Sequence, residues 1–119
     1  MITVIFEVIP KGDNEKSEYL SIAANLKFEL EKIDGFISIE RFQSFNDSAK
    51  ILSLSFWRDD ESIKQWRNIE LHRMAQAKGR EYLFKDYRLR VANVVRDYGI
   101  ADRKEVPQDS KIFHDKKYV

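Results

Sequence analysis

The sequence predicts one α+β domain with the element order strand-helix-strand-strand-helix-strand. Segments of strand length that are rich in β-branched and aromatic residues alternate with two longer segments whose apolar residues recur at helical spacing. Clusters of Gly, Pro, Asn, Asp and Ser separate these segments. The predicted strands cover residues 2–9, 36–44, 49–57 and 85–96, and the predicted helices cover residues 15–33 and about 60–78. This order is that of the ferredoxin-like split βαβ arrangement.

The first predicted strand is apolar on both faces. Ile2, Val4, Phe6 and Val8 alternate onto one face, and the other face is also mostly apolar apart from Glu7. We therefore expect this strand to be buried on both sides.

The first predicted helix can be capped by Asp13 or Asn14 and stops before Gly35. Phe28 lies off its apolar stripe and indicates a second contact surface. The stripe itself consists of Tyr19, Ile22, Ala23, Leu26, Leu30 and Ile33.

The middle strands form a predicted hairpin joined by the polar residues 45–48. The following run 58–62, Arg-Asp-Asp-Glu-Ser, is typical of a helix start because acidic residues favour the positive end of a helix. The second helix is expected to end at Gly79 and to break near Asn68, since asparagine side chains compete for backbone hydrogen bonds.

In the last predicted strand, apolar residues alternate with arginines. The chain from Asp97 onward is charged, contains Pro107 and is expected to be extended, and to be partly ordered only where it docks on another surface. The predicted domain therefore covers residues 1–98, and residues 99–119 form a charged C-terminal tail.

Two helices cover only one face of a four-stranded sheet. The opposite face carries too many apolar residues to be left in water, so we expect a second copy of the chain to cover it. The sequence thus predicts a homodimer.

Composition excludes several classes of protein. The 119 residues are 43% hydrophobic, which is incompatible with intrinsic disorder, and 21 Lys+Arg against 20 Asp+Glu leave a net charge of +1. A near-neutral chain has no overall attraction to nucleic acid or anionic membranes. The absence of cysteine excludes disulfides, thiolate metal sites and cysteine nucleophiles, and suits a reducing compartment.

The N-terminal stretch has no basic residue before its apolar run and is interrupted by Glu7, so it does not resemble an export signal. No apolar run has the length needed to cross a bilayer. We expect a cytoplasmic protein without a membrane partner.

RNA recognition motifs share this element order, but they need glycines and paired aromatic residues on the third strand. Here that strand reads Ala-Lys-Ile-Leu-Ser-Leu-Ser-Phe over residues 49–56. The four glycines are isolated, so there is no phosphate loop either. We expect no nucleic-acid partner.

Several segments together resemble the antibiotic biosynthesis monooxygenase (ABM) family. They are Gly35-Phe36-Ile37-Ser38-Ile39-Glu40-Arg41-Phe42, Leu54-Ser55-Phe56-Trp57-Arg58-Asp59-Asp60-Glu61, Trp66-Arg67, His72-Arg73-x-x-Gln76-x-x-Gly79-Arg80, Asp86-Tyr87-Arg88 and Val95-Arg96-Asp97-Tyr98-Gly99. The resemblance implies a dimeric α+β barrel, in which two ferredoxin-like sheets pack face to face and each subunit has a pocket between sheet and helices. Members of the family include cofactor-independent oxygenases of aromatic polyketides, haem-degrading monooxygenases, quinol oxygenases and many proteins with no established activity, so the resemblance implies one of several activities.

Haem-degrading members of the family carry an asparagine on the first strand and a tryptophan followed nearly three helical turns later by a haem-ligating histidine. In this chain Trp66 matches the tryptophan, Gln76 stands where the histidine is expected, and His72 lies one turn earlier. Glu7 and Val8 occupy the region of the asparagine. Haem ligation therefore requires a shifted geometry through His72.

His72 and Trp66 are the candidate catalytic residues. His72 can act as a general base, with a hydrogen-bonded structural histidine as the alternative, and Trp66 can form a flat wall for a planar ligand or serve as a core anchor. Phe6 or Phe28 can complete that wall, while Gln76 and Glu7 are further candidates for substrate contact.

The first functional hypothesis is a monooxygenase that acts on a planar aromatic or quinone-like molecule without a bound metal or flavin. The second is haem degradation, and the third is a binding or stress-response module without catalysis.

The spacing of Trp66 and His72 makes a geometric prediction. Six residues turn about 600° around an ideal helix, so the two side chains cannot share a face of a straight helix. Both can line one pocket if the helix breaks at residues 67–69.

Overall fold

The computed structural model describes residues 1–69, 72 and 82–117. In chain order its elements are β1 (Ile2–Pro10), α1 (Asp13–Glu31), β2 (Phe36–Gln43), β3 (Ile51–Trp57), α2 (Asp60–Arg67), β4 (Phe84–Asn93) and α4 (Gln108–Lys117). The strands form one antiparallel sheet in the order β2-β3-β1-β4. This topology confirms the predicted ferredoxin-like α+β fold.

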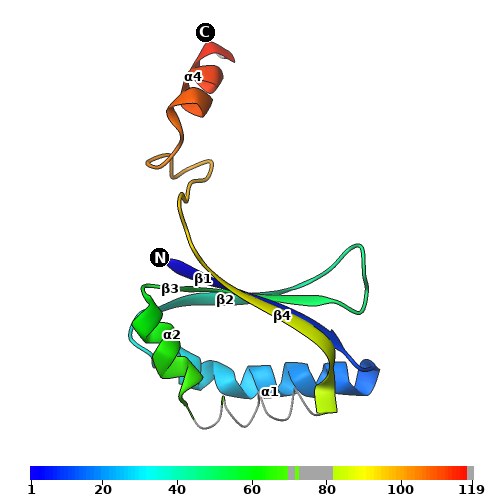
Figure 1. The fold of residues 1–119 in the computed structure, drawn as a ribbon. Helices are drawn as coiled ribbons and strands as arrows, with labels where there is room; N and C mark the ends of the chain where they lie inside the picture. The colour runs from blue at the N-terminus through cyan, green and yellow to red at the C-terminus, as the bar shows by residue number, and fades with distance from the viewer. Residues whose placement is uncertain (70–71, 73–81, 118–119) are drawn as a thin grey trace.

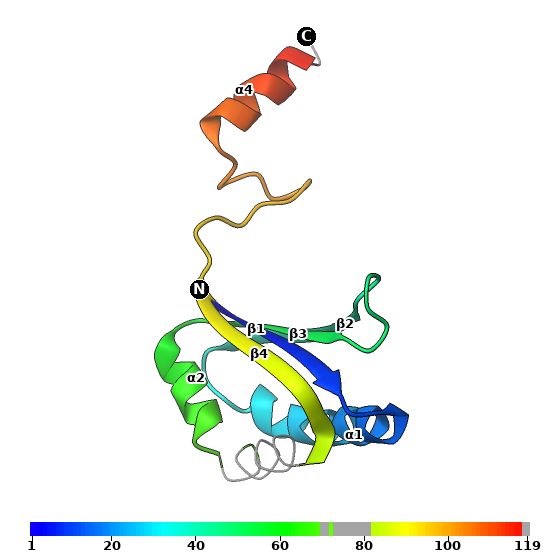
Figure 2. The same cartoon turned by 45° about the vertical axis from the view of Figure 1, so that its right-hand side comes forward.

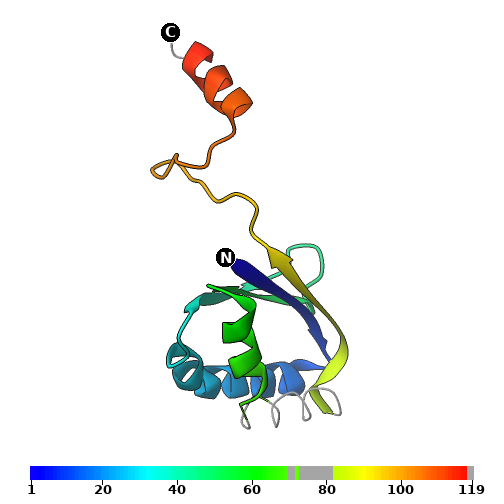
Figure 3. The same cartoon turned by 60° about the vertical axis from the view of Figure 1, so that its left-hand side comes forward.

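The body of the molecule has two layers. Helices α1 and α2 lie on the same face of the sheet, and the views from two directions agree on this (Figures 1 and 3). Alternation along β1 turns Val4, Phe6 and Val8 toward the helices, as the sequence predicts. Stripe residues of α1 face the same layer, since Tyr19 and Leu30 are buried there.

A β-bulge interrupts β2 near its start. Phe36 lies opposite Trp57, but Ser38 lies opposite Phe56, so Ile37 is an extra residue in this strand. An extra residue reverses the alternation of all side chains that follow it. As a result, Phe36 and Arg41 both face the helices.

The core between sheet and helices consists of two clusters. One contains Val8, Tyr19, Ile51 and Leu83, and the other contains Leu30, Ile33, Trp57 and Ile63. Trp57 is 1% exposed, and its ring meets that of Phe36 edge-on with 5.3 Å between centroids. The first cluster includes Tyr19 of α1, and the second includes Leu30 near the end of α1 together with Ile63 of α2, so α1 is packed at both of its ends and α2 at one.

The start of α2 is fixed by a group of residues that we call the β3–α2 junction: Asp34, Gly35, Arg58, Asp59 and Ser62. Asp59 is the N-cap, and its carboxylate accepts a 2.9 Å bond from the Ser62 backbone N–H. The buried Ser62 Oγ lies 2.8 Å from that carboxylate and 2.9 Å from the Asp34 carbonyl oxygen, and shares its one proton between them. Bonds from Ser62 and Arg58 lower the pKa of Asp59 to about 2.

The sheet face opposite the helices, which we call the helix-free face, is largely apolar. Ile5, Leu52, Leu54 and Phe56 lie on it half-buried, and Phe42 is exposed. In the described part of the chain no helix packs on this face (Figures 1 and 3).

The C-terminal segment leaves the body where β4 ends beside the N-terminus, at the bond from Val94 N–H to the Met1 carbonyl (Figure 2). The radius of gyration is 17.6 Å, whereas a compact chain of this length has about 13.5 Å. Contrary to the prediction of an extended tail, residues 108–117 form the helix α4. Pro107 precedes this helix, where a proline is well tolerated, and its carbonyl accepts a 2.9 Å bond from the Lys111 N–H.

We expect a chain that ends at Gly99 to keep the folded body. Hydrogen bonds such as Gly99 N–H to the Asp102 carbonyl and Asp97 N–H to the Glu105 carboxylate lie within the C-terminal segment. Thermal unfolding followed by circular dichroism should then shift by no more than a few degrees. A truncated chain without a cooperative transition would place the segment in the core.

Candidate functional site

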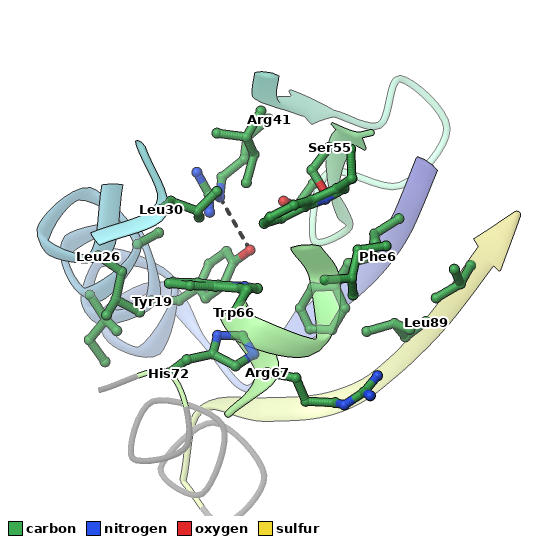
Figure 4. A pocket seen from close by; sticks show the side chains of 18 of the residues that line it. Phe6, Tyr19, Leu26, Leu30, Arg41, Ser55, Trp66, Arg67, His72 and Leu89 are labelled. Atoms are coloured by element: carbon green, nitrogen blue, oxygen red, sulfur yellow. Dashed lines mark hydrogen bonds between the residues drawn. The ribbon is translucent and has the colours of Figure 1, made fainter. Parts of the chain in front are cut away.

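A cavity of about 200 Å³ lies between the sheet, α1 and α2, and His72 and Leu83 also line it (Figure 4). It is bounded by members of both core clusters, and most of its lining is apolar. Its volume is below the range of about 300–1,000 Å³ that is typical of sites for drug-sized ligands, so a small ring system is the appropriate size of guest.

Trp66 and His72 meet in this cavity. Helix α2 ends at Arg67, and the Asn68 side chain donates a 2.9 Å bond to the Lys64 carbonyl, as expected of an asparagine that terminates a helix. The predicted break at residues 67–69 is therefore confirmed. It brings the two rings to 4.3 Å between centroids at an interplanar angle of 45°, and both line the cavity.

Burial changes the acid–base behaviour of His72. Desolvation of its imidazolium form lowers the pKa of His72 from 6.5 to about 4. The ring is therefore neutral at pH 7 and can accept a proton. A negative charge formed beside it raises this pKa again, because the opposite charge favours the imidazolium form.

The lowered pKa of His72 predicts a loss of stability at acidic pH. Between pH 6.5 and pH 4 the unfolded chain binds a proton at His72 that the folded chain does not, so stability falls as the pH decreases. After allowance for partial solvent screening, the difference between pH 7 and pH 5 amounts to about 1–2 kcal/mol.

Urea unfolding of the wild type and of His72→Gln at both pH values measures this contribution. The wild type should lose about 1–2 kcal/mol more than the variant on acidification. Equal losses in the two proteins would contradict the assignment.

The other predicted site residues occupy different places. Phe6 lines the cavity, and its ring contacts Phe84 and Tyr87 at 5.8 and 5.7 Å between centroids. Phe28 is 71% exposed on α1 and does not line the cavity.

Glu7 lies on the helix-free face, where its carboxylate is 3.5 Å from Arg90 and 3.9 Å from Lys50. Gln76 and the predicted helix end at Gly79 lie outside the described residues. The structure thus brings His72, Trp66 and Phe6 together and separates Phe28 and Glu7 from them.

Arg41 and Tyr19 are polar residues of the site that the sequence patterns did not indicate. The Arg41 Nε donates a 3.3 Å bond to the Tyr19 hydroxyl, and both residues line the cavity (Figure 4). Arg41 reaches the cavity because the bulge at Ile37 reverses the alternation of β2. Strict alternation from an inward Phe36 places Arg41 on the opposite face. Ser53 and Ser55, which alternate with apolar residues on β3, also line the cavity.

The described residues contain no group of three or more His, Asp or Glu side chains that could hold a metal ion. For haem, His72 offers a neutral imidazole as a ligand, and its ring contacts Trp66 at 4.3 Å between centroids. The cavity of about 200 Å³ favours a guest smaller than a porphyrin macrocycle.

Comparison with known proteins places the chain in a family. The family model described as antibiotic biosynthesis monooxygenase matches residues 1–78. Jasmonate monooxygenase ABM of Pyricularia oryzae is 48% identical over 94 residues, which make up 79% of this chain and 43% of that protein. The chain belongs to the antibiotic biosynthesis monooxygenase family, and it spans about half the length of the curated relatives it matches.

Solved structures support the same fold. Rv0793 from Mycobacterium tuberculosis is 14% identical with a TM-score of 0.72, over 82% of this chain and 98% of that one. A mutant form of SnoaB from Streptomyces nogalater, described as a cofactor-independent oxygenase, is 10% identical with a TM-score of 0.69, over 81% of this chain and 94% of that one. At these identities the similarity concerns the fold alone. None of the described helices is long and apolar enough to span a membrane.

Proposed function

We propose that this chain is an oxygen-dependent monooxygenase that oxidises a small planar aromatic or quinone-like molecule in the cavity. The observation that carries the proposal is the contact of the neutral His72 ring with Trp66, at 4.3 Å between centroids, inside an apolar cavity of a monooxygenase-family fold. SnoaB, which shares the fold, is named a cofactor-independent oxygenase, and by analogy the proposed reaction uses no tightly bound metal or flavin.

In the proposed reaction the substrate itself supplies the electrons that reduce O₂, so no other reductant is needed. A CH₂ group activated by neighbouring aromatic rings and a carbonyl loses one proton to the imidazole of His72. The resulting carbanion reduces O₂ and combines with it to give a hydroperoxide, C–OOH, after the proton returns. Loss of water from this hydroperoxide leaves C=O, so that R₂CH₂ and O₂ become R₂C=O and H₂O.

The cavity walls support each part of this sequence. The negative charge that develops on the substrate raises the pKa of His72 as the proton arrives, which partly offsets the weak basicity of the free ring. Trp66 and Phe6 offer flat surfaces to a planar substrate. The apolar lining reduces the contact of the carbanion with water.

Oxygen consumption with anthrone tests the proposal, because anthrone is a planar ketone with an activated CH₂ group. The expected result is uptake of one O₂ per anthrone at a rate well above that in buffer, with anthraquinone as the product. A rate equal to that of buffer or of an unrelated protein would contradict the proposal for this substrate class. The name of the Pyricularia oryzae relative makes jasmonate a second substrate to test.

Two other functions make different predictions. Haem degradation predicts a Soret shift on addition of haem that is lost in His72→Ala, and the small cavity argues against it. A binding or stress-response module predicts neither oxygen uptake nor a Soret shift.

We also propose that the working form is a homodimer whose subunits pack through the helix-free face. Support comes from the apolar side chains on that face, which are costly to leave in water. Sedimentation equilibrium at micromolar concentration should give a dimer, and Leu54→Arg should give a monomer. Phe28→Arg, which changes an exposed residue of α1, is the matched control and should remain dimeric. A monomeric wild type would contradict the proposal.

The proposed location of the protein is the cytoplasm. Its cysteine-free composition suits a reducing compartment. Fractionation of cells that express the chain with an antibody tag should recover it with cytoplasmic markers, and recovery outside the cytoplasm would contradict this.

A further inference from the structure

The polar part of the cavity is cationic. Arg41 and Arg67 both line it, and no Asp or Glu occurs among its described lining residues. His72 adds no charge to the cavity, since its imidazole is neutral at pH 7. An apolar cavity with arginines and no carboxylate in the described part of its wall is electrostatically complementary to an anion.

Arg41 is held in place by neutral groups. Its Nε bonds to the Tyr19 hydroxyl at 3.3 Å, and its guanidinium carbon lies 5.8 Å from the centre of the Tyr19 ring. This leaves the two terminal nitrogens, which form the fork that recognises a carboxylate, without an ion-pair partner among the described residues.

Other arginines of the same chain do have such partners. Arg58 pairs with Asp34 at 3.1 Å and with Asp59 at 3.0 Å, and Arg90 pairs with Glu7 at 3.5 Å. Arg41 is half-buried, whereas Arg58 and Arg90 are exposed. An unpaired positive charge is therefore less favourable at Arg41 than at the other two arginines. A ligand with a carboxylate would supply the negative charge that Arg41 lacks, so its binding should be more favourable than that of a neutral ligand of the same shape.

We propose that the cavity binds a small amphipathic carboxylate, with the carboxylate on the Arg41 fork and the ring system against Trp66 and His72. Arg41 enters from the sheet, whereas Trp66 and His72 enter from the helix side (Figure 4). The anionic group of the ligand then lies at one wall and the ring at the other. Arg67, exposed at the end of α2, adds positive charge on the approach to the cavity. This inference rests on the proposed function for the site and names the charge class of its substrate.

Binding of 2-naphthoate and 2-naphthamide by isothermal titration calorimetry tests the proposal without any turnover. The two molecules have nearly the same shape and differ in charge. The wild-type chain should bind 2-naphthoate at least tenfold more tightly than 2-naphthamide, and 0.5 M NaCl should reduce the difference.

Variants identify the residue responsible. Arg41→Gln should weaken 2-naphthoate binding by about 10–100-fold and change 2-naphthamide binding by less than twofold. The affinity of Arg41→Lys for 2-naphthoate should lie between those of the wild type and Arg41→Gln, because lysine keeps the positive charge but lacks the two terminal nitrogens of the fork. Arg103→Gln removes the same charge from the C-terminal segment, where Arg103 contacts Tyr98, and should bind as the wild type does.

Equal affinity of the wild type for the two naphthalenes, or no binding of 2-naphthoate at millimolar concentration, would overturn the proposal even if Arg41→Gln does not fold. Equal losses in Arg41→Gln and Arg103→Gln would also overturn it, since they would indicate only a general charge effect. Oxygen uptake with uncharged anthrone is independent of these results. Turnover of anthrone without a preference for carboxylates would leave the monooxygenase proposal standing and refute this one.

Discussion

Replacement of His72 by glutamine is expected to lower kcat for anthrone oxidation by about 10²–10⁴-fold, the usual contribution of a positioned general base. Glutamine retains a polar side chain of similar reach but cannot accept the proton at neutral pH. The KM should change little, because Trp66 and Phe6 continue to offer the flat walls of the cavity. Steady-state oxygen consumption over a range of anthrone concentrations separates the two constants.

The matched control is His114→Gln, the same substitution at the second histidine of the chain, which belongs to the α4 segment. It should retain wild-type turnover. Unchanged kcat in His72→Gln would contradict the assignment of the base. The base would then have to be Glu7, acting from the helix-free face, and Gln76, outside the described residues, could contact the substrate but not take up its proton.

The Gly35→Ala substitution is expected to destabilise the folded chain by about 2–5 kcal/mol, through backbone strain and overpacking together. Gly35 has a φ of +97°, which side-chain-bearing residues rarely adopt. A Cβ at this position would lie 1.9 Å from the Ser62 Oγ and 2.9 Å from the Ser62 Cβ. Ser62 is fully buried in the β3–α2 junction, so it has no room to move away.

Gly99→Ala is the matched control for this substitution. A Cβ at Gly99 meets nothing within 4 Å. The free energy of unfolding of Gly99→Ala should therefore stay within about 0.5 kcal/mol of that of the wild type. Urea unfolding of the two variants gives the comparison. A Gly35→Ala variant as stable as Gly99→Ala would show that the junction is adaptable. Because this junction sets the start of α2, we also expect the loss to reduce binding at Trp66.

Local rules predicted most of the fold. The order of strands and helices follows from the periodicity of apolar residues, and the start of α2 follows from the acidic run that begins at Asp59. The break after Arg67 was predictable because Trp66 and His72 cannot share a face of a straight helix, and Asn68 is well suited to end one.

The bulge in β2 and the helix α4 could not be predicted from the alternation of apolar and polar residues alone. The bulge at Ile37 is set by the pairing of β2 with β3, and it decides that Arg41 lies in the cavity. The helix α4 follows Pro107 in a charged segment with a weak apolar pattern, so composition predicted an extended chain there. Phe28 was a reasonable candidate as an off-stripe aromatic residue, but its position on the outer side of α1 leaves it 71% exposed.

In the proposed reaction, the cavity beside Trp66 and His72 catalyses the transfer of one atom of O₂ to a substrate. Reaction of the chain with anthrone under ¹⁸O₂, followed by mass spectrometry of the anthraquinone, measures this transfer. We predict a product that is 2 Da heavier, formed at the enzymatic rate, with the label lost to background in His72→Gln. An unlabelled product, or labelled product formed at equal rates by the wild type and His72→Gln, would contradict it.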